Sequence, residues 1–227
     1  MHPSIRNLAP RITAVGAIGA VVLFSSLTAV AGKTFVMPTA RPARTYPAHD
    51  EHTTEKVTAA VDPYDMGDKA EIFSVNYHEY GFLPIFFVLS NESDQPVSLS
   101  GMKIELITVK NVKLAPLTTD DLLRRMSHPS RNDRQGVPLP IPLPGKVKGA
   151  VSKQTQEEIS QAQFAAKAVE PHTTASGFLF FDVSDLSTPL AGASFYLTSV
   201  RDASGNELMY FEIELEKYLS APQEKKP

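Results

Sequence analysis

Few residues of this chain have types and spacings that could do chemistry, and the closest group is the run His49-Asp50-Glu51-His52. Imidazoles and carboxylates are side chains that bind transition metals. Firm binding also needs a helix or strand that fixes the ligands, and the surrounding residues show no apolar periodicity. We interpret the run as part of a solvated polar linker, with weak metal binding as the alternative.

The remaining histidines support two further hypotheses. His78 and Glu79 could serve as an acid–base pair in a hydrolase, but neighbouring side chains on an extended chain point to opposite faces. His128 and His172 lie far apart in the sequence, and each stands beside a proline turn. They are the residues that a small-ligand or metal site would use in the second hypothesis.

Known catalytic patterns are missing from the sequence. We find no serine–histidine–aspartate order, no HExxH, no glycine-rich phosphate loop and no paired carboxylates on a defined element. Cysteine is absent, which excludes disulfides, thiolate metal sites, a cysteine nucleophile and a bacterial lipid anchor. We therefore predict a protein that is not an enzyme and holds no cofactor or metal.

The charge balance bears on possible partners. The formal net charge is −3, so neither nucleic acid nor an acidic membrane surface is favoured as a partner. No basic patch interleaved with aromatic residues appears along the chain. We therefore expect no binding to nucleic acid.

The N-terminus predicts the compartment. Residues 1–11 carry two arginines and no acid, and residues 12–31 carry no charge. The apolar stretch ends in Ala29-Val30-Ala31 before Gly32, which is typical of a secretory signal peptide cleaved after Ala31. The alternative is an uncleaved signal anchor, because about 20 apolar residues can span a bilayer. In both cases the rest of the chain is exported to the periplasm or cell envelope, and it meets the membrane only through an uncleaved N-terminal segment.

The rest of the chain is divided by composition. Residues 32–56 are rich in proline, threonine and alanine, and we predict a disordered tether. Residues 57–219 form the predicted domain, and the polar residues 220–227 a flexible tail. Within the domain, residues 113–170 interrupt the strand pattern and are predicted as a helix-containing insertion, with helices over 118–126 and 152–168.

Two short apolar runs, at residues 82–91 and 177–183, predict the core strands of the domain. Each is rich in aromatic and branched residues, as in a strand buried on both faces. Residues 102–109 and 208–215 instead alternate apolar and polar side chains, as half-buried antiparallel strands do. The fold class that follows is mainly β, an antiparallel β-sandwich.

A proline-rich run within the insertion is the predicted partner contact. Proline at every second position forbids a helix and a central strand and leaves an extended, polyproline-like segment. Such a segment could bind an aromatic groove or act as a stiff surface connector. The run consists of Pro138, Leu139, Pro140, Ile141, Pro142 and Leu143.

Two sequence phrases carry a resemblance to a known group of proteins. The first is Gly81-Phe82-Leu83-Pro84-Ile85 followed by Ser90-Asn91-Glu92-Ser93, and the second is Gly177-Phe178-Leu179-Phe180-Phe181-Asp182 after Pro171. With these phrases the chain resembles uncharacterised bacterial exported proteins that contain an immunoglobulin-like β-sandwich, a domain of unknown function. The resemblance covers about half the chain and implies an immunoglobulin-like fold and no catalytic residues.

The sequence thus leads to two functional expectations. The first is an exported, non-enzymatic sandwich that binds or assembles another envelope protein. The second is a periplasmic protein that binds a small ligand or metal through the inserted region 113–170. The insertion is the expected place for binding in both, because long irregular segments commonly carry function.

Overall fold

A computed structural model describes residues 34–127 and 151–222 of the chain. The predicted signal segment with its cleavage residues Ala29, Ala31 and Gly32 lies outside the described residues. The same holds for His128 and the proline-rich run Pro138–Leu143. Among the helices of the described ranges, none is long and apolar enough to cross a membrane.

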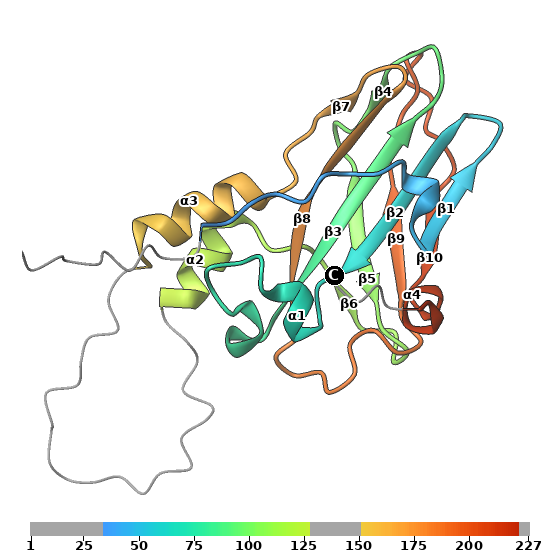
Figure 1. Ribbon diagram of the computed structural model, residues 1–227. Helices are drawn as coiled ribbons and strands as arrows, with labels where there is room; N and C mark the ends of the chain where they lie inside the picture. The colour runs from blue at the N-terminus through green and yellow to red at the C-terminus, as the bar shows by residue number, and fades with distance from the viewer. Residues whose placement is uncertain (1–33, 128–150, 223–227) are drawn as a thin grey trace, which may run out of the picture. The chain divides into compact units, whose positions relative to one another are not determined.

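The protein is mainly β and is built on two antiparallel sheets of four strands each (Figure 1). The first sheet has the order β1 (Ala48–His52), β2 (Val57–Pro63), β3 (Phe82–Asn91) and β8 (Thr173–Asp182). The second has the order β10 (Phe211–Glu214), β9 (Ser194–Thr198), β5 (Lys103–Ile107) and β6 (Lys113–Leu114). A short pair joins β4 (Val97–Ser98) to β7 (Ala168–Val169).

The two sheets share one apolar core, as in a β-sandwich. On β3, alternate residues from Leu83 to Leu89 face this core, and Phe195 on β9 and Phe211 on β10 meet them from the second sheet. The rings of Phe87 and Phe195 stack with their centroids 5.7 Å apart. This interlocking of inward side chains is what the alternating pattern of β5 and β10 predicts.

A second core covers the outer face of the first sheet, so every residue of β3 is buried. Phe86 on β3 and Phe178 on β8 face outward and pack against Tyr64 and Phe73, whose rings lie 4.9 Å from that of Phe178. The sheet is therefore covered on both sides, which explains why β3 is a continuous apolar run and does not alternate.

Two helices complete this second core (Figure 1). Helix α2 (Thr119–Ser127) is capped by Thr118, whose hydroxyl accepts a hydrogen bond from the Asp121 amide at 3.1 Å. Helix α3 (Lys153–Ala162) is capped by Ser152, as predicted. The prediction that this helix runs to residue 168 is wrong. The chain becomes extended at Gln163, and the Phe164 amide donates to the Phe178 carbonyl of β8 at 2.9 Å.

The remaining short elements lie at the ends of the strands. They are η1 (Ala43–Thr45), α1 (Gly67–Ala70), η2 (Tyr77–Tyr80) and α4 (Glu216–Ser220). The insertion is shorter than predicted, because its first residues form β6 and its last ones form β7. Its two helices lie over the second core and are anchored there by Leu122 and Ile159.

The structure corrects the prediction of a disordered tether over residues 32–56. From residue 34 onward this segment packs on the first sheet, and Phe35, Ala43 and Tyr46 are buried. Strand β1 pairs along its whole length with β2, from Ala48 opposite Val61 to His52 opposite Val57. The segment is held by isolated apolar side chains and by pairing with a neighbouring strand. Neither produces a periodic pattern in the sequence.

Glu158 of α3 ties the outer helix layer to the segment that precedes β3. Its buried carboxylate accepts hydrogen bonds from the Ser74 amide at 2.8 Å and from the Tyr77 hydroxyl at 2.9 Å. We expect Glu158→Ala to lower the free energy of unfolding by about 1–3 kcal/mol, because both donors lose their acceptor. Urea unfolding of Glu158→Ala beside Glu157→Ala, an exposed neighbour, checks this. Equal stability of the two variants would contradict it.

Candidate functional site

The described part of the chain contains an open cavity of about 790 Å³. It lies between residues 38–47 before β1, residues 62–72 at and beyond the end of β2, and residues 218–222 at the end of α4. We call it the tyrosine groove, after the three tyrosines in its wall. The lining residues that matter here are Arg41, Tyr46, Asp62, Tyr64, Lys69 and Tyr218.

Local structure places the tyrosines. Tyr64 directly follows β2, and its amide donates to the Pro84 carbonyl of β3 at 2.9 Å, which extends the pairing of the two strands. Tyr218 lies on α4, and its hydroxyl donates to the Pro63 carbonyl at 3.0 Å and to the Asp65 carboxylate at 2.8 Å. Helix α4 is thereby fastened to the end of β2.

The cation of Lys69 lies inside this arrangement. Its ammonium pairs with the Asp62 carboxylate and donates to the Pro63 carbonyl at 3.0 Å. It also lies 5.0 Å from the ring centroid of Tyr64 and 4.7 Å from that of Tyr218, within the range of cation–π attraction. The four-residue helix α1 carries Lys69 to this position.

Burial dominates the electrostatics of the Asp62 carboxyl. Desolvation raises its pKa above the ordinary value, and the nearby Lys69 ammonium opposes this shift only in part. Burial also raises the pKa of the Tyr64 hydroxyl, and the Asp62 charge adds to the effect. At neutral pH Tyr64 is therefore a neutral hydroxyl that can donate a hydrogen bond.

The raised pKa of Asp62 gives a testable pH dependence. The folded state binds a proton on Asp62 more readily than the unfolded state does, so the contribution of Asp62 to stability falls as pH rises above its ordinary pKa of 3.8. Relative to Asp62→Asn, the wild-type free energy of unfolding should therefore rise as the pH is lowered from 7 towards 4. Urea unfolding of both proteins at several pH values measures this difference. A difference that is constant with pH, or that has the opposite slope, would contradict the assignment.

The Tyr64 hydroxyl is free to act on a ligand. The side chain is 9% exposed and lines the groove, yet within the described residues its hydroxyl makes no hydrogen bond. Of the charged groups in the lining, Lys69 and Asp62 pair with each other, the Arg41 guanidinium lies over the Tyr46 ring, and Asp68 accepts a hydrogen bond from the Lys69 amide. The groove therefore offers one hydrogen-bond donor that the described residues leave unused, in a wall of largely buried tyrosine rings.

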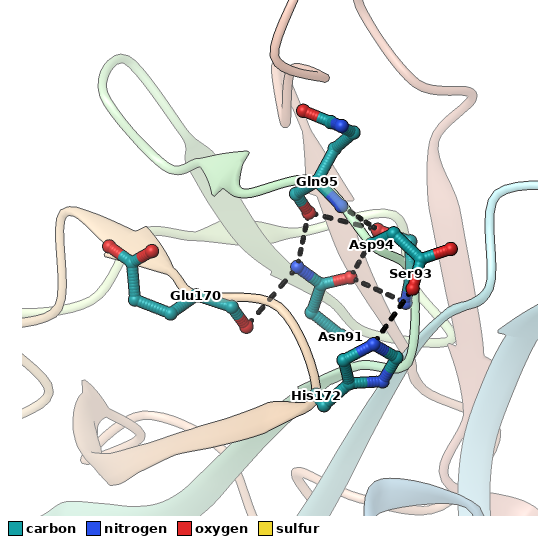
Figure 2. A network of polar contacts seen from close by, with 6 residues as sticks. All are labelled: Asn91, Ser93, Asp94, Gln95, Glu170 and His172. Atoms are coloured by element: carbon teal, nitrogen blue, oxygen red, sulfur yellow. Dashed lines mark hydrogen bonds and ion pairs between the residues drawn. The ribbon is translucent and has the colours of Figure 1, made fainter.

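A second polar cluster surrounds Asn91 at the far end of β3 (Figure 2). The fully buried Asn91 amide donates to the carbonyls of Gln95 at 2.8 Å, Val169 at 3.0 Å and Glu170 at 3.3 Å. Its side-chain oxygen accepts from the Ser93 amide at 3.0 Å and the Ser93 hydroxyl at 2.7 Å. All of its bonding capacity is used to close the turn after β3 onto β7, which is a structural role.

Two of the histidines named in the sequence analysis, His78 and His172, lie in the described part of the chain. The imidazole of His172 pairs with Asp94 at 2.9 Å on the exposed edge of the Asn91 cluster (Figure 2). His78 and Glu79 lie on η2, so the expectation of an extended chain there is wrong. The Glu79 carboxylate accepts from the Asn76 side chain at 3.0 Å.

The run from His49 to His52 forms β1, and its side chains contact different parts of the fold. His49 bonds to the Tyr46 carbonyl at 2.6 Å, and His52 stacks on the Phe211 ring at 3.9 Å. Asp50 accepts from the Glu212 amide of β10 at 2.9 Å and so joins the two sheets. In the described ranges no three histidine or acidic side chains are grouped so as to hold a metal ion.

The tyrosine groove was not predicted from the sequence. Tyr64 stands in a turn and Tyr218 near the end of the chain, and the bond from Tyr218 to Asp65 spans 153 positions. Neither residue belongs to a motif, and only the fold brings them together. No family model, curated protein or solved structure matches this chain.

Proposed function

We propose that this chain is an exported, non-enzymatic binding module of the cell envelope, with a sandwich of immunoglobulin-like topology. The strand order supports the topology. In immunoglobulin domains one sheet has the order A-B-E and the other G-F-C. If β2, β3 and β8 are A, B and E, then β10, β9 and β5 take the places of G, F and C, and every pair is antiparallel.

The observation that carries the binding function is the Tyr64 hydroxyl, which lines an open cavity and makes no hydrogen bond within the described residues. Catalysis by an acid or base needs a group whose pKa lies near the working pH, and burial raises the pKa of the Tyr64 hydroxyl above its ordinary value. Here Lys69 is paired with Asp62, and Tyr218 is bonded to Asp65 and Pro63. Such internal pairing leaves the open cavity and the Tyr64 hydroxyl as the properties of the groove that a ligand can use.

The partner that we propose is another protein of the envelope. The cavity is open, and the Tyr64 hydroxyl in its wall can donate a hydrogen bond to a backbone carbonyl, which suits the recognition of a polypeptide. The proposed surface lies outside residues 113–170, the insertion in which the sequence analysis expected binding. The helices of that region instead cover the second core.

Site-specific photo-cross-linking in the source cell tests the proposal. A photoreactive phenylalanine analogue is placed in the full chain at Met66 in the groove, or at Lys103 on β5 of the second sheet as a control. We expect one envelope protein to be captured from Met66 and not from Lys103. In spheroplasts, added protease should cleave the domain, as expected if the domain lies outside the cytoplasm. Equal capture from both positions, or none from Met66, would contradict the proposal.

A further inference from the structure

One wall of the tyrosine groove is formed by residues 65–72, a segment that buries little of itself. The segment runs between two buried side chains, Tyr64 and Phe73, and none of its own residues is buried. Its helix α1 has four residues and no side-chain cap, and a Cβ atom on Gly67 would have no atom within 4 Å. So short a helix gains little from packing to offset the entropy lost when it is ordered.

Lys69 links this segment to the first sheet by a charged contact. Its ammonium pairs with the Asp62 carboxylate and donates to the Pro63 carbonyl at 3.0 Å, and both partners lie at the end of β2. The Lys69 and Asp62 side chains are 25% and 18% exposed, so water screens their attraction less than that of a surface pair. Ile72 adds partly buried packing on the second core beside Phe73. The ion pair is thus the contact that holds α1 itself in the wall.

Asp62 is the member of this pair that a proton can neutralise. The groups that surround it come from several elements, namely Lys69 on α1, Arg41 before β1, Tyr64 and Asp65 after β2, and Tyr218 on α4. Burial raises the pKa of the Asp62 carboxyl, and the Lys69 charge opposes this shift only in part. Asp62 therefore takes up a proton at milder acidity than an ordinary aspartate, whose pKa is 3.8. The two tyrosines stay neutral, because burial raises the pKa of their hydroxyls.

Proton uptake by Asp62 removes the negative charge from the pair. The folded protein binds this proton more readily than the unfolded chain does, so the neutral form accumulates in the folded state as the pH falls. Lys69 then keeps the Pro63 carbonyl and the ring faces of Tyr64 and Tyr218 as neighbours. An ammonium that is partly withdrawn from water and has lost its counter-charge is costly, and a move into solvent relieves that cost.

We propose that the Lys69–Asp62 pair is a pH-sensitive latch, which holds α1 in the wall of the tyrosine groove at neutral pH and releases it when Asp62 takes up a proton, so that the groove widens for its partner. The purpose of the latch rests on the proposed function, because an exported domain meets the pH of the surroundings. The release itself concerns this chain alone and needs no partner.

An NMR titration of a protein of residues 32–227 tests the latch. The Asp62 Cγ shift reports proton uptake, and the backbone ¹⁵N order parameters of residues 67–70 report the order of α1. We expect these order parameters to fall from about 0.85 at pH 7 to below about 0.6, with the same midpoint as the Asp62 shift. The amide of Leu122 on α2 should keep its order over this range. Unchanged order at α1, or a midpoint that differs from that of Asp62, would overturn the inference.

Asp62→Asn imitates the protonated carboxyl, and we expect it to lower the order of α1 already at pH 7. The matched control is Asp121→Asn, which removes an ion pair with Arg124 on the surface of α2. This control should leave α1 ordered at pH 7. If α1 were as ordered in Asp62→Asn as in Asp121→Asn, the pair would not be the latch.

Photo-cross-linking from Met66 separates the latch from the proposed function. At neutral pH the Asp62→Asn chain should capture the envelope protein at least about threefold more than the Asp121→Asn chain does, because its groove is already open. Equal capture from the two chains would overturn the widening of the groove. If α1 loses its order with Asp62 titration while no chain captures a protein from Met66, the latch stands and the proposed function fails.

Discussion

Replacing Gly177 with alanine is expected to lower the free energy of unfolding by about 3 kcal/mol, at the upper end of the usual cost of overpacking. A Cβ atom at this position would lie 2.5 Å from the Phe164 Cα and 2.7 Å from the Phe164 nitrogen. These are backbone atoms, and they are held by the bond from the Phe164 amide to the Phe178 carbonyl. The Phe164 ring is held as well, at 4.9 Å from that of Phe87 in the core between the sheets.

The crossing at Gly177 explains the size of this effect. The chain leaves α3 on the outer core, passes over β8 at Gly177, and places Phe164 against the inner core. Any side chain on Gly177 pushes the two segments apart. Urea unfolding measures the loss, with Gly67→Ala as the control, because a Cβ at Gly67 has no atom within 4 Å. If Gly177→Ala were as stable as Gly67→Ala, the close crossing would be wrong.

Asn91→Ala is expected to have a comparable effect, a loss of about 3 kcal/mol in the free energy of unfolding. The substitution removes one fully buried amide and leaves the Val169 carbonyl and the Ser93 amide without their partner. Each buried group left unpaired costs about 1–3 kcal/mol. Because the amide joins the turn after β3 to β7, the turn should also become open to proteolysis.

The matched control for this experiment is Asn206→Ala. Asn206 is also a turn asparagine, but it is exposed and bonds to Asp202 at the surface. We expect its substitution to change the free energy of unfolding by less than about 0.5 kcal/mol. Thermal melts and limited proteolysis of both variants make the comparison. An Asn91→Ala protein with the melting temperature and proteolysis pattern of Asn206→Ala would refute the structural role.

The strands that form the cores could be predicted from the sequence. β3 and the second half of β8, residues 177–181, are apolar on both faces because they are covered on both faces, and β10 alternates because only one of its faces is buried. The N-caps at Ser152 and Thr118 were also visible as local patterns. Each of these signals is contained in a few neighbouring residues.

The predictions that were wrong concern features that depend on contacts with residues distant in the sequence. The polar residues of β1 look like a linker, and they form a strand because β2 lies beside them. Residues 163–168 have helical composition, yet the helix ends before them, because the Phe164 amide donates a hydrogen bond to the Phe178 carbonyl of β8. The tyrosine groove is lined by three segments that are distant in the sequence. Its residues form no local sequence pattern from which the groove could have been predicted.

The central claim, that the tyrosine groove is the docking surface, is tested most directly by a map of backbone amide NMR shifts. A protein of residues 32–227 is compared with and without a saturating amount of the envelope protein captured from Met66. We predict shift changes concentrated in residues 38–47, 62–72 and 218–222, which line the groove. Changes concentrated instead around the stacked rings of Tyr196 and Tyr210, on the second sheet and the segment before β10, would contradict the claim and place the docking surface there.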